Sequence, residues 1–528
     1  MAGWEGGIDS TRGGGACMPP RSVAPAFPRR PEVAAGGSLL AVAVQACPPL
    51  LAVLLALRPL RNFDLGYHVR TGELLLGPGY PATDPFSYTV TRPWVLEQWL
   101  GSVFYYLVWA VGGFVGVTIV KALLVGGVFA LSGRAARQTG APPLAAAVAG
   151  VVGVLVAEPR FQARPFVFSM LSLGILVGAL IALRQRNVPW RGLALAGLFA
   201  VWPHFHPEYL TGFAVMGAFG VGAIGEVVLA GWTSRLDAIL DTRGVLRLVA
   251  IGVACAVAAV TSLALFHPTG LDSLVEVWAL SSSEFFRMNT NEVRPLWMNY
   301  GFTLPTVILF AGPPLVWLAV RRSIVLSYVA VHLLLAVTAI RVGRMVGDAA
   351  VVIIPVWAHA AGLAWRAWRA RPRAARLVAH ARAAHVALVI AVVALAVPFV
   401  RAGHGWQLDW DERFYPRRCF EWIDAHDPPG NVWNDQFFGH IFIFHFAGRR
   451  KVSMDQRANY TERDFRDYYA MGNAQPGWEA EAARLGVGWW LLYPSRHEEL
   501  HYALTTSPKW QRVYSDGKCV IYLPRPAA

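Results

Sequence analysis

The chain has 528 residues, of which 55% are hydrophobic and only 15% are charged, and its formal net charge is +14. Soluble domains contain about 25% charged residues, so this composition excludes a soluble enzyme, a disordered scaffold and a small secreted disulfide module. It is typical of a protein that crosses a membrane many times. Whether the basic excess indicates a nucleic-acid partner depends on where the arginines lie.

The N-terminal 36 residues are rich in Gly, Pro and Arg, and we expect residues 1–36 to form a disordered cytoplasmic tail. The apolar stretch that follows begins too late for a cleaved signal peptide. This position favours an uncleaved first membrane span.

Residues 37–405 form a series of apolar stretches of membrane-spanning length. We therefore predict a mostly α fold, a polytopic transmembrane bundle of about eleven helices. The stretches are 37–57, 114–133, 142–157, 165–183, 192–205, 209–230, 245–266, 302–320, 323–340, 346–363 and 384–400. Some are short, so a pair such as 192–205 and 209–230 could instead be helices that break near the membrane surface.

Arginines gather before the first stretch and after every even-numbered one, the richest run being 366–382. Cytoplasmic loops carry an excess of Lys and Arg, which places the N-terminus in the cytoplasm and residues 406–528 outside the cell membrane. The expected location is the cytoplasmic (inner) membrane, with many passes. The basic excess is then topological, and we expect no nucleic-acid partner.

Two of the outer segments are long enough to have structure of their own. Residues 58–113 form a long first loop that ends in an aromatic, amphipathic run from Trp94, typical of a helix lying along the membrane surface. Residues 406–528 alternate strand-like and helix-like runs, and they predict a small extracytoplasmic α/β domain. Asp516-Gly517 marks the turn of its last hairpin. In an oxidising compartment Cys419 and Cys519 could form a disulfide there.

Asp64 is the leading candidate for a catalytic residue, because it lies shortly after the first span on the outer side. A carboxylate at this position could act as a general base or hold a divalent metal, or it could be a helix cap or a solvated charge. His68 follows at i+4, so on a helix the two side chains would share a face. Glu158, at the outer end of the third span, is the second candidate acid. Asp84 is more typical of a turn cap before Pro85.

Arg341 and Arg344 lie on the outer side, which otherwise has few arginines. Arginine binds phosphate through planar bidentate hydrogen bonds, so these two residues are candidate phosphate contacts; snorkelling to lipid headgroups is the alternative. Weaker candidates of the same kind are Arg160, Arg164 and Arg294.

The segment WPHFHPEY contains His204, His206 and Glu208, which resemble metal ligands on paper. One short motif without a cysteine or a second carboxylate is a weak metal signal, and no CxxC pair occurs in the chain. We therefore favour His204 and His206 as polar lining of a substrate cavity. No cofactor is firmly predicted, and a divalent metal remains possible.

Taken together, these features resemble the GT-C glycosyltransferase superfamily, which includes protein O-mannosyltransferases, oligosaccharyltransferases and the aminoarabinose transferases of lipid A. The segments FDLGYHVRTGE, TDPFSYT, EQWL, WPHFHPEYLTG and RVGR are similar to a group of bacterial multi-pass members. WNDQFFGHIFIF and KVSMDQR match the outer domain of the same group. The resemblance covers the chain from about residue 60 to its end.

The resemblance implies a glycosyltransferase that takes its sugar from a polyprenyl-phosphate donor at the outer membrane face. Asp64 would be the base or a metal ligand, Glu158 the second acid, and Arg341 or Arg344 the phosphate contact. Several superfamily members have two adjacent acids in the first loop, whereas Leu65 follows Asp64 here. This departure favours a mechanism without a metal.

Two other functions stay open at this stage. A membrane transporter or lipid flippase would carry ionisable residues deep in its helices, where Lys121 and His332 are the main candidates, and it would often show an internal repeat, which we do not find. A non-catalytic envelope assembly protein would have Asp64 and Glu158 pointing away from each other and from any pocket.

Overall fold

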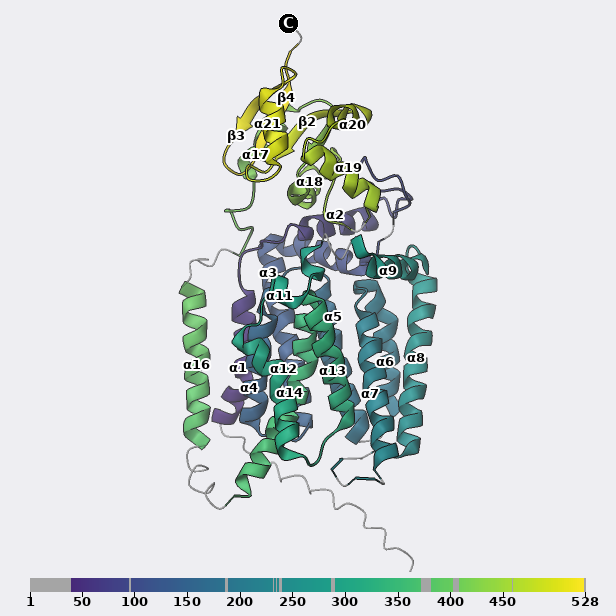
Figure 1. Ribbon diagram of the computed structural model, residues 1–528, viewed down its shortest axis with the longest axis vertical. Helices are drawn as coiled ribbons and strands as arrows, with labels where there is room; N and C mark the ends of the chain where they lie inside the picture. Colours follow the sequence, from purple (N-terminus) through teal and green to yellow (C-terminus); the bar gives the residue numbers. More distant parts are fainter. Residues whose placement is uncertain are drawn as a thin grey trace, which may run out of the picture.

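The fold is taken from a computed structural model, which describes residues 39–526 except 95, 186–188, 231, 234, 237–239, 286–289, 372–380, 402–407 and 458. The predicted disordered tail, residues 1–36, lies outside the described residues. A bundle of long helices carries the C-terminal part of the chain on one end (Figure 1). We call this end the capped end, and the part of the chain that covers it, residues 408–526, the C-terminal region.

Each of the eleven predicted apolar stretches coincides with a helix of the bundle. The helices are α1 (Leu39–Ala56), α3 (Trp99–Gln138), α4 (Pro143–Ala157), α5 (Phe166–Gln185), α6 (Pro189–Phe205), α7 (Tyr209–Leu229), α8 (Thr242–Phe266), α12 (Leu304–Val320), α13 (Leu326–Arg341), α14 (Val346–Arg369) and α16 (Ala381–Arg401). Among the described residues, seven helices are long and apolar enough to cross a membrane, and three shorter apolar helices accompany them. The protein is a multi-pass membrane protein with a mostly helical fold, as predicted.

Shorter elements cover the capped end of the bundle. They are α2 (Asp64–Leu76), α9 (Asp272–Ser282), α11 (Leu296–Asn299) and the 3-10 turns η1 (Glu158–Arg160), η2 (Asn291–Val293) and η3 (Gly343–Met345). Most of the polar residues singled out above lie on these elements or on the helix ends next to them. The fold therefore gathers them at one end of the bundle.

The helix α3 contains a break at Gly113, where φ is 58° and ψ is −160°. A positive φ of this kind suits glycine, which has no Cβ. Residues 99–112 pack against α2, and at Gly72 a Cβ would lie 2.4 Å from the carbonyl oxygen of Ser102. The break thus separates the amphipathic aromatic segment from the part of α3 that enters the bundle.

The C-terminal region holds one four-stranded mixed sheet among five helices. The elements are α17 (Arg417–His426), β1 (Asn431–Asn434), α18 (Gln436–Phe446), α19 (Glu462–Gly472), α20 (Trp478–Arg484), β2 (Val487–Leu492), α21 (Glu498–Thr506), β3 (Trp510–Ser515) and β4 (Val520–Pro524). The strand order is β1-β2-β4-β3, with β1 parallel to β2 and the other pairs antiparallel. Trp433, Trp489 and Trp490 are fully buried in its core.

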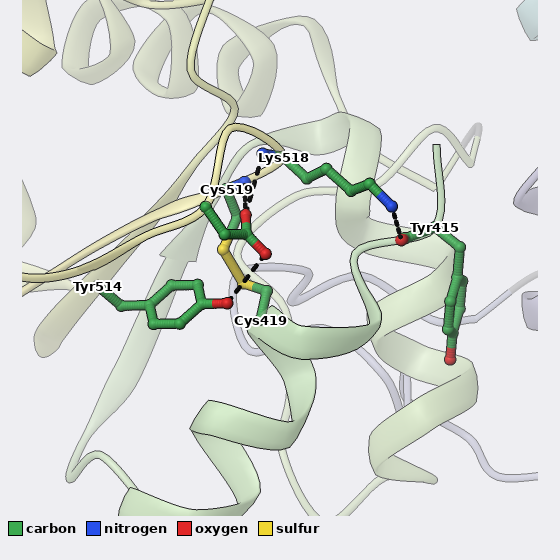
Figure 2. The surroundings of a disulfide bond; sticks show 6 residues. Tyr415, Cys419, Tyr514, Lys518 and Cys519 are labelled. Carbon is green, nitrogen blue, oxygen red and sulfur yellow. Dashed lines mark hydrogen bonds between the residues drawn. A yellow bond between two sulfur atoms is a disulfide. The ribbon is translucent and has the colours of Figure 1, made fainter. Parts of the chain in front are cut away.

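A disulfide joins Cys419 in α17 to Cys519, the residue just before β4 (Figure 2). The hairpin before Cys519 turns at Asp516-Gly517, as predicted. Asp516 Oδ1 accepts hydrogen bonds from the backbone N–H groups of Lys518 and Cys519, and Gly517 adopts a φ of 78°. The disulfide therefore holds the last hairpin against the first helix of the C-terminal region.

Candidate functional site

Asp64 begins α2 at a point where three separate parts of the chain meet. Its backbone N–H donates to Asn62 Oδ1 at 2.8 Å. One carboxylate oxygen lies 2.6 Å from His440 Nδ1, and the other lies 2.8 Å from Arg164 Nη2. The residue is only 6% exposed. A carboxylate from the first loop thus contacts one cation from the segment before α5 and an imidazole from the C-terminal region.

The surroundings of Asp64 keep its carboxyl group ionised. Burial would raise the pKa of Asp64, but Arg164 and His440 outweigh it and hold that pKa well below its usual range. For His440, burial favours the neutral ring, but Asp64 and Asp455 overcome this and raise the pKa to about 9. The pair at neutral pH is therefore a carboxylate and an imidazolium joined by a charge-assisted hydrogen bond.

A second row of charges continues from His440 through the C-terminal region. His440 Nε2 lies 3.4 Å from Asp455 Oδ1. Arg457 lies 2.7 Å from Asp455 and also 2.7 Å from Asp84. Because Asp84 belongs to the first loop, Arg457 connects the C-terminal region to that loop a second time. Asp84 caps its turn as well, because its Oδ1 accepts the backbone N–H groups of Phe86 and Ser87. The two regions are therefore joined by a buried, alternating row of charges.

Glycines make the close approach of α2 and α18 possible. A Cβ at Gly66 would lie 2.8 Å from Phe444 Cβ and 2.9 Å from the carbonyl oxygen of His440, and a Cβ at Gly439 would lie 2.4 Å from Asp455 Cβ. Because a side chain has no space at either position, Gly66 lets α2 approach α18 until His440 reaches Asp64, and Gly439 lets the segment that carries Asp455 approach α18.

Beside Asp64 lies a second group of charges, which we call the Glu208 cluster. Its members are Arg160, His206, Glu208, Glu292, Arg344 and Asp348. Arg164 connects it to Asp64, because Arg164 Nη1 lies 2.7 Å from Glu292. Within the cluster Arg160 lies 3.6 Å from Glu292 and 4.0 Å from Glu208.

The Glu208 cluster has buried polar atoms that the protein does not satisfy. Among the described residues, neither carboxylate oxygen of Glu208, nor Asp348 Oδ1, nor Arg344 Nε has a hydrogen-bond partner. Burial raises the pKa of Glu208, although Arg160 and Arg344 oppose this rise. Unsatisfied buried groups are costly, so a cluster of them indicates a place where a polar ligand or water completes the site.

No protein-family model and no curated protein matches the sequence, but solved structures with a similar fold do. The apo oligosaccharyltransferase of Archaeoglobus fulgidus superimposes with a TM-score of 0.55 at 13% identity, over 85% of this chain and 69% of that chain. ArnT from Cupriavidus metallidurans bound to undecaprenyl phosphate gives a TM-score of 0.50 at 16% identity, over 92% of this chain and 97% of that chain. This chain has the GT-C fold. At these identities the likeness concerns the fold alone.

Within the GT-C fold, the two candidate acids have different surroundings. Asp64 contacts Arg164 and His440 as described above, whereas Glu158 forms an ion pair with Arg58. Arg58 also donates to the carbonyl oxygen of Glu158 at 3.1 Å. Asn62 bonds Gln162 at 2.8 Å, so the loops that carry the two acids touch each other.

The histidines lie close to the capped end but contact different partners. His68 Nδ1 lies 2.9 Å from Ser102 Oγ, and burial lowers the pKa of His68 to about 3. His204 accepts from Trp99 Nε1 at 3.0 Å and contacts Ser262 at 2.6 Å. His206 lies in the Glu208 cluster, 3.5 Å from Glu208.

The two candidate arginines separate as well. Arg344 belongs to the Glu208 cluster. Burial and the nearby charge of Arg344 lower the pKa of His206. Arg341 ends α13 and is exposed. The structure therefore brings Asp64 and Arg344 into connected groups of charges and leaves Arg341 at the surface.

The surroundings of Asp64 do not fit a divalent metal. Both groups that contact its carboxylate are cationic, and a metal requires deprotonated ligands. Within the part of the chain that the structure describes, no group of three or more His, Cys, Asp or Glu side chains is placed to hold a metal ion. We derive no chemical step through a metal.

Five residues of the site were not among the candidates from sequence: His440, Asp455, Arg457, Glu292 and Asp348. The signal for two of them was present: His440 interrupts the apolar run QFFGHIFIF, and Asp455 follows the strand-like KVSM. Isolated polar residues in apolar segments are either satisfied in the core or functional, and only the three-dimensional contacts distinguish the two.

Proposed function

We propose that this protein is a glycosyltransferase that moves a sugar from a polyprenyl-phosphate donor to an acceptor at the outer face of the cytoplasmic membrane. The observation that carries the proposal is the position of the charged site. Asp64 begins α2, which lies at the capped end of the bundle (Figure 1), and Arg164 connects Asp64 to the Glu208 cluster. Several buried polar atoms of the cluster have no partner in the described chain.

The charges suit the chemistry of glycosyl transfer from a phosphate. As the acceptor oxygen bonds to the anomeric carbon, the bond from that carbon to the phosphate oxygen breaks, and negative charge develops on the leaving phosphate. Arg160 and Arg344, beside unsatisfied atoms of the cluster, would stabilise that charge. Asp64 would accept the proton that the acceptor hydroxyl loses.

Asp64 can take this role while it keeps its two partners. A carboxylate offers about four lone-pair sites, and His440 and Arg164 occupy two of them. His440 would then be a positioning residue, which fixes the carboxylate and brings the C-terminal region to the reacting atoms.

The orientation of the protein rests on two further observations. The disulfide Cys419–Cys519 is of a kind that persists in oxidising compartments, which supports an extracytoplasmic C-terminal region. The arginine-rich connections after the even-numbered spans support a cytoplasmic opposite end. ArnT, whose fold is similar, was solved bound to undecaprenyl phosphate, and this supports a polyprenyl phosphate as the ligand here.

The test is turnover of labelled polyprenyl-phosphate sugars by membranes that contain the full chain, with total envelope extract as the acceptor. We expect wild type to consume a donor and form a labelled product, and Asp64→Asn to be about 10²- to 10⁴-fold slower, because it loses the general base. Asp272→Asn is the matched control, since Asp272 begins α9 at the same end but is exposed. Equal turnover by wild type and Asp64→Asn would remove Asp64 from the mechanism, and no turnover of any donor would favour a carrier or an assembly protein.

A further inference from the structure

A second polar feature lies beside Asp64 and belongs neither to the Glu208 cluster nor to the row of charges through His440. It is a cavity of about 350 Å³ between the end of α1, the segment before α5 and the C-terminal region. Its polar lining comes from Arg58, Arg61, Asn62, Lys121, Gln162 and Gln456. Ligand pockets occupy roughly 300–1,000 Å³, so this cavity fits a small head group and not a whole lipid. We call it the Lys121 cavity.

Lys121 is the unusual residue of the lining. It lies in α3 eight residues after the break at Gly113, and it is 1% exposed. Its ammonium group donates to the carbonyl oxygen of Arg58 at 3.3 Å. In the described chain no carboxylate lies within ion-pair distance of it. A buried charge inside a membrane helix is costly, and it indicates function unless a partner neutralises it.

The other cations of the cavity have carboxylate partners. Arg58 pairs with Glu158, and Arg61 Nε lies 2.9 Å from Asp411 Oδ2. Lys121 is therefore the cation of the lining whose charge neither Glu158 nor Asp411 neutralises. An ammonium has three N–H donors, and the Arg58 carbonyl uses one, so two can reach a ligand in the cavity.

The cavity also lies next to the proposed base. Asn62 lines it, and the same side chain accepts the backbone N–H of Asp64 and donates to Gln162, which lines it too. A group held in the cavity would thus contact Asn62, two residues before Asp64 in the chain. Gln456 of the C-terminal region also lines the cavity and is exposed.

We propose that the Lys121 cavity binds the phosphate group of a substrate head group, with Lys121 as the neutralising cation. Because the Glu208 cluster is the proposed site of the donor phosphate, the phosphate bound in this cavity is that of a phosphorylated acceptor. This inference deepens the proposed function and adds a phosphate site separate from the Glu208 cluster.

The experiment is calorimetric binding to the purified full chain in nanodiscs, with three probes: inorganic phosphate, glucose 1-phosphate and undecaprenyl phosphate. Lys121→Met removes the charge and keeps an apolar side chain of similar length. Gln456→Trp fills the cavity from an exposed position, so it should fold normally. Lys451→Met is the matched control, because Lys451 is an exposed lysine of the C-terminal region.

We expect Lys121→Met to weaken binding of at least one phosphate probe by about 10- to 100-fold, since a hydrogen bond to a charged group is lost. Gln456→Trp should weaken the same probe, and Lys451→Met should not. A loss confined to the soluble probes supports an acceptor phosphate in the cavity, and a loss confined to undecaprenyl phosphate contradicts it, because the donor phosphate would then bind here and not at the Glu208 cluster. Unchanged affinity of Lys121→Met for all three, or no binding by wild type, overturns the inference. Because binding is measured without turnover, this result is independent of the test of the proposed function.

Discussion

Two glutamates at the two ends of α7 are buried in opposite ways. At the end away from the C-terminal region, Glu226 is 0% exposed and accepts hydrogen bonds from Arg184 Nη2 at 3.1 Å and from the backbone and hydroxyl groups of Ser327 at 2.9 and 3.0 Å. At the capped end, Glu208 comes just before α7, and neither of its oxygens has a hydrogen-bond partner among the described residues.

The difference separates a structural charge from a charge available to a ligand. Around Glu226 the helices approach closely, and a Cβ at Gly222 would lie 2.3 Å from Ser327 Cα. The packing therefore delivers partners to both carboxylate oxygens. Around Glu208 the nearest cation, Arg160, is 4.0 Å away. A buried carboxylate whose oxygens are all hydrogen-bonded by the protein is part of the fold. One whose oxygens have no protein partner is free to bind water or a polar ligand.

The largest effect should come from Glu226→Ala. It leaves Arg184 buried without its carboxylate, and removing one partner of a buried pair costs about 3–5 kcal/mol. We expect a clear loss of thermal stability in detergent. Glu208→Ala, the matched variant at the other end of α7, should lose much less, because no hydrogen bond of its carboxylate is broken. Equal losses in the two variants would contradict the comparison.

A somewhat smaller effect should appear in the pH dependence of the row of charges at the capped end. The pKa of His440 is about 9 in the folded protein against an ordinary value near 6.5. The folded pKa is raised, so this stabilisation is complete below about pH 6.5 and is lost as the pH rises through about 9. It amounts to at most about 3 kcal/mol. The groups that face His440 are Asp64, Asp455 and the Tyr67 ring.

The measurement is protease protection of the C-terminal region between pH 6 and pH 9.5. Wild type should lose protection toward pH 9, and His440→Gln should show a flatter profile. Asp64 and Asp455 have lowered pKa values, so their contribution is present at neutral pH and disappears only as the pH falls below about 4. A profile for His440→Gln that matches wild type would exclude the His440 pair as the link between the two regions.

The smallest effect should come from Arg344→Gln. It removes a charged donor from the Glu208 cluster and should weaken binding of undecaprenyl phosphate by about 10- to 100-fold, with little change in thermal stability. Arg341→Gln is the control, because Arg341 is exposed three residues earlier in the chain. If Arg341→Gln weakens binding as much as Arg344→Gln, the Glu208 cluster is not the site.

Much of the fold could be predicted from the sequence because membrane helices must satisfy their backbone internally and must be apolar over a fixed length. That rule predicted the apolar stretches that form the bundle helices of the described chain. The sequence left open whether α6 and α7 are separate helices, and the structure shows that they are, with WPHFHPEY at their junction. The preference of Asp-Gly for tight turns predicted the hairpin at Asp516-Gly517. The disulfide between Cys419 and Cys519, which the sequence left as one alternative, is present.

The site was harder to predict from the sequence, because its geometry depends on contacts between distant segments. Asp64 and Arg344 were candidates from their position alone, but the residues that surround Asp64 come from 100 and 376 positions further along the chain. Nothing local in QFFGHIFIF distinguishes a core histidine from one that reaches a carboxylate on another helix. The need for glycine at Gly66 and Gly439 also cannot be read from the sequence, because it arises from close contacts with distant segments.

The most direct test of the proposed site is a cryo-EM structure of the full chain in nanodiscs with undecaprenyl phosphate. The account predicts phosphate density at the capped end, within hydrogen-bonding distance of Arg344 or Arg160. Phosphate density near the middle of the bundle, for example beside His332, would contradict a transferase site at the capped end and would indicate a carrier.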